Sequence, residues 1–295
     1  MGKKQIGILT DSNSGISLEQ GKKYDIGIIP MPFTIEGKEY YEELTLQKEQ
    51  FFEQLNARKS IKTSQPSIEE LVKIFEQELE KYEEIIYIPM SSGLSGSFMT
   101  ASIVAREYEG RVHVIDNHRI SCTQKQSVLE ARNLAEQGYS VLEICKILEE
   151  YKYKASIYIA VETLDYLKKG GRITKSAAVI GDMLNIRPVL QIQGDQLDAY
   201  KKVRGKKAAR RALIQAVDED MQHRFKGKEV VIKGAYCGEI SEAHEWQEML
   251  KEHFPEHVIS IDPLAWSICC HIGPSATAVV CMEKMVEAPD VLYEI

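Results

Sequence analysis

The sequence lacks any apolar run long enough to cross a membrane. A membrane-spanning helix needs roughly 18 consecutive apolar residues, whereas the apolar groups of this 295-residue chain are only a few residues long. The first of them, Ile6–Leu9, is also too short for the apolar core of a signal peptide. Residue 6 is isoleucine, so the Ser or Thr that N-myristoylation requires there is missing. We therefore expect a cytoplasmic protein with no membrane span.

Positive charge is also scarce. The chain has 37 lysines and arginines against 44 aspartates and glutamates, which gives a net charge of -7. Nucleic-acid-binding proteins usually present a basic face, so we expect no nucleic-acid partner. The phosphate-binding pattern G-x-x-x-x-G-K-[ST] is absent as well, which argues against direct use of ATP by this chain.

The six cysteines lack the spacing of a metal site. They stand among apolar residues, as buried reduced thiols usually do. A chain of this length with 44% hydrophobic residues can bury a large core without disulfides. We therefore expect reduced thiols, no metal and no cofactor.

The most informative stretch is an apolar run, 85–89, that leads into a loop rich in serine and glycine, 90–97. β-branched and aromatic residues at this density suit a strand that is buried on both faces. Apolar residues at helical spacing follow the loop, so Ser92, Ser95 and Gly96 should lie between a strand end and a helix N-terminus. Open α/β sheets bind ligands at that position, and the backbone N–H groups there favour an anion. The loop by itself fits a Ser/Gly turn without a ligand equally well.

Another polar loop follows the first predicted strand, 5–9. Its Asp11 and Ser12 are a second possible ligand loop. Asp11 either contacts a ligand or caps the helix that begins near Ser17, and capping alone explains an aspartate at this place.

A third polar loop, 62–67, precedes a helix with a clear start signal. Ser67 followed by Glu70 is a capping box. Because Ser67 is explained as a cap, the hydroxyl groups of Thr63 and Ser64 remain for a ligand.

Repeated units of strand, loop and helix predict the fold class of the first part of the chain. They are typical of a mostly parallel sheet, which we place in an N-terminal α/β domain over residues 1–154, with a small excursion at about 31–58. After residue 154 the pattern changes, because Gly194-Asp195 is a hairpin turn signal between two predicted strands. We therefore predict a C-terminal α+β domain with antiparallel strands over residues 155–295.

Six short motifs are spread over nearly the whole chain. They are Thr10-Asp11-Ser12, Thr63-Ser64-Gln65-Pro66, Ser91-Ser92-Gly93-Leu94-Ser95-Gly96, Leu167-Lys168-Lys169-Gly170-Gly171-Arg172-Ile173, Arg187-Pro188-Val189-Leu190 and His271-Ile272-Gly273-Pro274. Each motif alone is weak, but the ordered set is specific. In this order they resemble the DegV family of bacterial proteins.

The resemblance implies a two-domain α/β protein that holds one long-chain fatty acid in a tunnel between its domains and catalyses no chemistry alone. It implies a partner, a separate ATP-using fatty acid kinase subunit, that phosphorylates the bound carboxylate. It leaves open a transient contact with a membrane surface for lipid exchange. Carried onto this sequence, it assigns the carboxylate to Thr63, Ser64, Ser95 and Gly96, with His271 and Arg172 nearby, and partner docking to Arg204.

The chain departs from the family pattern at several places near these motifs. Ser275 and Ala276 follow the His271 motif where a further glycine is usual, and Asn117 stands where Ser or Thr is common. Trp266 adds bulk close to the expected cavity. The length and saturation of the fatty acid therefore stay open.

Other interpretations remain beside this one. The segment 93–97 is one residue short of the G-x-S-x-G nucleophile elbow, so a serine hydrolase that uses Ser95, with His271 as its base, is an alternative. A lipid or small-acid carrier without a kinase is another. His271 also fits a histidine buried in the core, and the lysines and arginines between 201 and 211 fit a solvated helix face.

Overall fold

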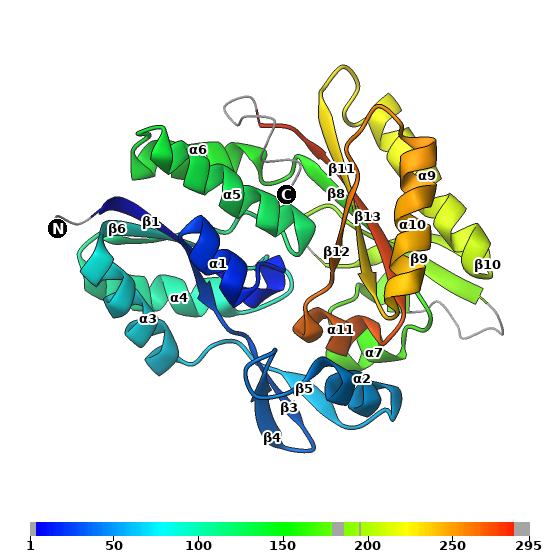
Figure 1. The fold of residues 1–295 in the computed structure, drawn as a ribbon, viewed down its shortest axis with the longest axis horizontal. Coiled ribbons are helices and arrows are strands. Elements are labelled where there is room, and N and C mark those ends of the chain that lie inside the picture. Colours follow the sequence, from blue (N-terminus) through cyan, green and yellow to red (C-terminus); the bar gives the residue numbers. More distant parts are fainter. Residues whose placement is uncertain (1–3, 179–185, 195, 286–295) are drawn as a thin grey trace.

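The computed structural model describes residues 4–178, 186–194 and 196–285, and three β-sheets organise them (Figure 1). The N-terminal sheet has the spatial order β2-β1-β6-β7, and its strand pairs are all parallel. This is the parallel sheet that the sequence predicts. Its strands are β1 (Lys4–Asp11), β2 (Ile26–Ile29), β6 (Tyr82–Ile88) and β7 (Val112–Val114).

Three of the helices around this sheet begin at a capping box, and the sequence predicts the one at Ser67. Ser17, Ser67 and Ser140 each form a capping box with the residue three positions on. The interpretation of Asp11 as the cap of the helix near Ser17 is wrong, because Asp11 caps a one-turn helix (Ser12–Ser14) instead. The longer helices are α1 (Leu18–Tyr24), α3 (Ile68–Lys81), α4 (Ser97–Ala105), α5 (Cys122–Glu136) and α6 (Val141–Tyr151), and a further one-turn helix covers Arg106–Tyr108.

The excursion near residue 31 is a three-stranded antiparallel sheet of order β4-β3-β5. It continues to residue 63, beyond the predicted limit of about 58, because β5 returns to pair with β3. Thr63 thus ends an edge strand, although the sequence places it in a loop. The elements are β3 (Pro32–Ile35), β4 (Lys38–Tyr41), α2 (Lys48–Asn56) and β5 (Ile61–Thr63).

The C-terminal sheet has six strands in the order β10-β9-β8-β13-β11-β12. All its pairs are antiparallel except β11 with β12, which agrees with the predicted change of pattern. Asp195 of the predicted hairpin turn lies outside the described residues. The strands are β8 (Ala155–Val161), β9 (Ile186–Ile192), β10 (Asp198–Arg204), β11 (Val230–Cys237), β12 (Ser260–Pro263) and β13 (Ala276–Glu283).

One element of this sheet has no counterpart among the predicted ones. The sequence patterns predict no strand after residue 261, yet β13 lies in the middle of the sheet, between β8 and β11. The helix that precedes it, α11, is equally unpredicted. The helices of this part are α7 (Asp165–Gly170), α8 (Lys175–Ala178), α9 (Lys206–Gln222), α10 (Ile240–His253) and α11 (Trp266–Ile272).

The two large sheets face each other across α5, and a single apolar cluster extends from one sheet to the other (Figure 1). The cluster joins Ile8 and Ile86 of the N-terminal sheet to Ile157 and Val280 of the C-terminal sheet. Among the described helices, none is long and apolar enough to cross a membrane. The six cysteines are unpaired, and five of them are buried.

Candidate functional site

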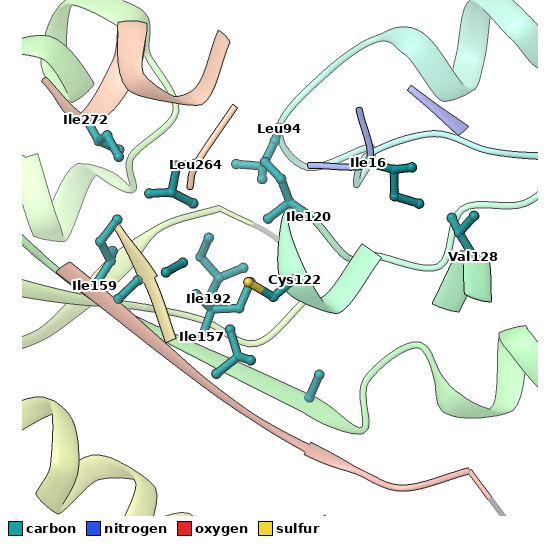
Figure 2. Packing of buried hydrophobic residues seen from close by; sticks show 14 of the residues in the cluster. Ile16, Leu94, Ile120, Cys122, Val128, Ile157, Ile159, Ile192, Leu264 and Ile272 are labelled. Atoms are coloured by element: carbon teal, nitrogen blue, oxygen red, sulfur yellow. The ribbon is translucent and has the colours of Figure 1, made fainter. Parts of the chain in front are cut away.

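A cavity of about 140 Å³ lies inside the apolar cluster, between the two large sheets. Figure 2 shows Leu94 and Ile120 on the side of the N-terminal sheet, opposite Ile157, Ile159 and Ile192 on the side of the C-terminal sheet. Aliphatic side chains from both parts of the chain therefore enclose it. Such an apolar lining suits a hydrocarbon chain, because burial of apolar area drives binding at about 25 cal/mol per Å².

The polar wall of this cavity centres on Thr63 and His271. The Oγ1 of Thr63 lies 2.8 Å from Nε2 of His271, although 208 positions separate the two residues. Thr63 stands at the end of β5, and His271 stands on α11, which packs against β5 and α7. The pair therefore joins the small sheet to the C-terminal part.

Burial keeps His271 neutral. It lowers the pKa of the imidazole from 6.5 to about 4, and the nearby charge of Arg172 acts in the same direction. His271 therefore supplies hydrogen-bonding capacity at neutral pH, while the positive charge of this wall resides on Arg172.

This pKa predicts a pH dependence of stability. On acidification the unfolded chain takes up a proton at His271 near pH 6.5, but the folded chain does so only near pH 4, so protons favour unfolding in between. From pH 7 to pH 5, wild type should lose about 2 kcal/mol more unfolding free energy than His271→Gln, which does not titrate. Urea denaturation at both pH values measures this difference, and equal losses in the two proteins would contradict it.

Arg172 connects the same wall to the serine-rich loop. Its Nε donates to the backbone oxygen of Leu94 at 3.2 Å, and a second nitrogen donates to the backbone oxygen of Gly170. These two contacts use two of the five N–H donors of a guanidinium. Arg172 can therefore hold the loop in place and still donate to an anion in the cavity.

The serine-rich loop lies between β6 and α4, as the sequence predicts. Gly96 is the N-cap of α4, and the Oγ of Ser95 accepts from the backbone N–H of Ser97 at 3.2 Å. The hydroxyl groups of Ser95 and Ser97 lie 2.8 Å apart. Ser95 and Gly96 both line the cavity at a helix N-terminus, where a negative charge is favoured.

All six residues assigned to a carboxylate, Thr63, Ser64, Ser95, Gly96, Arg172 and His271, line this one cavity. Three further possible ligand contacts, Asp11 and Ser12 of the second loop and Ser92 of the serine-rich loop, do not line it.

Asp11 and Ser12 have structural contacts instead. The buried carboxylate of Asp11 accepts from the backbone N–H groups of Asn13 and Met90, at 3.0 and 2.8 Å. The hydroxyl of Ser12 accepts from the backbone N–H of Met31. Ser92 is exposed, and its backbone N–H donates to Asp116.

Several polar lining residues are absent from the predicted set. Asn13, Ser121 and Ser267 line the cavity, and Ser267 donates a hydrogen bond to the side-chain oxygen of Asn13. The polar loop after β1 therefore reaches the cavity through Asn13. The sequence signal was the loop itself, but strand and turn patterns do not say which of its side chains faces inward.

Gly170 is a positioning residue that the sequence does not single out. A Cβ at this place would lie 2.2 Å from Nδ1 of His271, so the backbone of α7 touches the imidazole ring. Its neighbour Gly171 has a left-handed conformation (φ 68°) and open space around it. Gly170 is thus required for close approach, and Gly171 for its backbone conformation.

Arg204 ends β10, which is an edge strand of the C-terminal sheet (Figure 1). It is exposed, as are Lys202, Lys207 and Arg211. Arg210 of the same segment is buried and pairs with Glu245, 3.2 Å away. In the cationic segment, 201–211, Arg210 therefore stabilises the fold through an ion pair, and the exposed lysines and arginines face solvent.

Three comparisons with known proteins agree on a single family. A family model for the uncharacterised DegV proteins matches residues 5–284. A DegV domain-containing protein of Deinococcus radiodurans is 33% identical over 275 residues, which cover 93% of this chain and 97% of that protein. A Thermotoga maritima protein named fatty acid-binding protein is 30% identical over 278 residues, covering 92% of this chain and 95% of that protein. A fatty-acid-binding protein of Thermus thermophilus has a similar structure, with a TM-score of 0.85 and 26% identity, over 95% of this chain and 100% of that one.

Proposed function

The chain belongs to the DegV family, and from this we propose that it binds one long-chain fatty acid in the cavity between its two large sheets. The observation that carries the proposal is the cavity itself. Its walls are aliphatic, and its polar residues include Thr63, Ser95, Arg172 and His271. An apolar chain with one anionic end matches both features.

The donors on this wall support a carboxylate as the anionic end. Hydroxyl groups of Thr63 and Ser95 can donate to it without the desolvation cost of another buried charge. The guanidinium of Arg172 supplies positive charge, which favours the ionised acid. A carboxylate beside His271 would also raise the pKa of the imidazole, because an opposite charge stabilises the protonated form.

Mass spectrometry of lipid extracted from the purified protein tests this proposal. We expect about one long-chain fatty acid per chain, and the spectrum will identify its length and saturation. Protein that carries no lipid, and that binds none when fatty acids are added, would contradict the proposal.

Gly170→Ala tests the role of the His271 ring. The added methyl group must displace the imidazole from Thr63, so we expect fatty acid affinity to fall by about tenfold, as the loss of one hydrogen bond would give. Gly171→Ala is the matched control. It strains the backbone at a positive φ and should lower stability by about 1 kcal/mol, with fatty acid affinity unchanged. Equal affinities of the two variants would contradict this role for Gly170.

We further propose that the bound carboxylate is presented to a separate ATP-using kinase subunit, and that this chain performs no catalysis alone. A carboxylate oxygen would attack the terminal phosphorus of ATP, the bond from that phosphorus to its bridging oxygen would break, and ADP would leave with the electron pair. Arg204 would contact the kinase.

We also propose that the protein is cytoplasmic. We propose two domains, 1–154 and 155–295, and place the boundary there because β8 begins at Ala155.

A carrier without a kinase partner fits the same cavity, and the Arg204 experiment below distinguishes the two. The geometry gives no support to a serine hydrolase. In the described part of the chain, Ser95 bonds to Ser97, and the His271 imidazole bonds to Thr63. A nucleophile needs a base within hydrogen-bond reach, and this serine and histidine have other partners.

A further inference from the structure

A second hollow, of about 430 Å³, adjoins the Thr63–His271 pair. We call it the vestibule. It shares Thr63, Arg172 and His271 with the apolar cavity, so these three residues stand between the two spaces. Any group bound in the vestibule would therefore be next to the head group of a ligand in the cavity.

The vestibule is strongly cationic in a chain whose net charge is -7. The carboxylate of Asp165 lines it too and lies 3.9 Å from the guanidinium of Arg58. Lys59, Lys62 and Lys169 are exposed. A concave surface with an excess of one sign of charge concentrates ions of the opposite sign. The cationic residues come from the turn between α2 and β5, from β5 itself and from the segment around α7, and they are Arg58, Lys59, Lys62, Lys169 and Arg172.

We propose that the vestibule binds a phosphoryl group at the carboxylate end of the fatty acid. This inference rests on the proposed function, and it assigns to this chain a part of the phosphoryl-transfer site. Lysine and arginine are the side chains that bind phosphate oxygens most strongly. The bound phosphoryl group belongs either to the ATP donor, as its terminal phosphate, or to the acyl phosphate product.

The vestibule lies where the phosphoryl group must arrive in the proposed reaction. During transfer, the new bond joins a carboxylate oxygen to phosphorus, and the bond to the bridging oxygen of ADP breaks. The phosphoryl group must therefore leave ADP on the kinase side and become bonded to the carboxylate oxygen, which we place beside Thr63 and His271. Cations in the vestibule would neutralise the charge that this group brings to the carboxylate.

The test compares two ligands with the same hydrocarbon chain, on full-length protein stripped of lipid. One is the fatty acid, and the other is a 2-oxoalkyl phosphonate, in which a CH₂ replaces the bridging oxygen of the acyl phosphate. Lys62→Glu/Lys169→Glu reverses two charges of the vestibule. Lys168→Glu is the control, because Lys168 is exposed on the same helix as Lys169 and does not line the vestibule.

We expect the double variant to bind the phosphonate about tenfold more weakly than wild type or Lys168→Glu, with unchanged affinity for the fatty acid. Unchanged phosphonate affinity would refute a phosphoryl site in the vestibule. This holds even if the variant slowed a kinase, because the cations would then be explained by docking of an acidic protein surface. If the stripped wild-type protein does not bind the fatty acid, the proposed function itself is overturned.

A competition arm identifies the source of the phosphoryl group. ATP that displaces the phosphonate from wild type but not from the double variant would show that the vestibule also receives the donor phosphate. Failure of ATP to compete, with the phosphonate result intact, would restrict the vestibule to the acyl phosphate.

Discussion

Thr63→Val/Ser95→Ala is expected to yield a purified protein with little bound fatty acid. Each substitution removes a hydroxyl that we assign to the carboxylate. A hydrogen bond to a charged group contributes about 1.5 to 3 kcal/mol, so the affinity should fall by about 100-fold or more. Valine keeps the shape of threonine at the end of β5, and the edge strand should therefore persist. Calorimetric titration of the stripped protein with the fatty acid measures the loss.

Ser92→Ala is the control for this experiment. Ser92 belongs to the same loop but is exposed and does not line the cavity, so its removal should leave the affinity unchanged. Full lipid content in the double variant would refute the assignment of Thr63 and Ser95 to the head group. Equal loss in Ser92→Ala would indicate that the loop, and not the hydroxyls, determines binding.

Arg204→Ala is expected to slow acyl phosphate formation by the cognate kinase subunit by more than about 30-fold. An exposed arginine at the centre of an interface commonly contributes 2 kcal/mol or more to association. The variant should keep its fatty acid, because Arg204 does not line the cavity. The measurement is the rate of acyl phosphate formation at low kinase concentration, together with the lipid content of the variant.

Arg106→Ala is the matched control, since Arg106 is exposed but lies outside the cationic segment. The deficit of Arg204→Ala should shrink at high kinase concentration, and the association of wild type should weaken with salt. An unchanged rate in Arg204→Ala would refute docking at this residue. Lost lipid would show that the residue supports the fold instead.

The elements that the sequence predicts best are those with a local signal. Ser67 caps its helix as predicted because its capping-box partner, Glu70, lies only three residues away. The strand at 85–88 follows from its density of β-branched and aromatic residues. The central position of β13 depends on pairing with Val161 and Cys237, which are far away in sequence. No local pattern contains that information.

The candidate site shows the same division. Serine and threonine in polar loops marked possible anion sites, and Ser95 does stand at the N-terminus of α4. The 2.8 Å contact of Thr63 with His271 joins residues 208 positions apart, and only resemblance to a family placed them together. Asn13 and Gly170 were missed because their roles depend on which way a side chain points and on how closely a backbone approaches a ring.

The place of β13 in the chain also determines when the cavity can exist during synthesis. The N-terminal sheet has all its strands once residue 114 has left the ribosome, and it can fold early. β8 and β11 both pair with β13, so the strand edges that face it stay unpaired until β13 is made. Unpaired strand edges favour aggregation. Ala278 and Val280 of β13 line the cavity, and His271 comes just before them. The complete cavity can therefore form only after translation has passed β13.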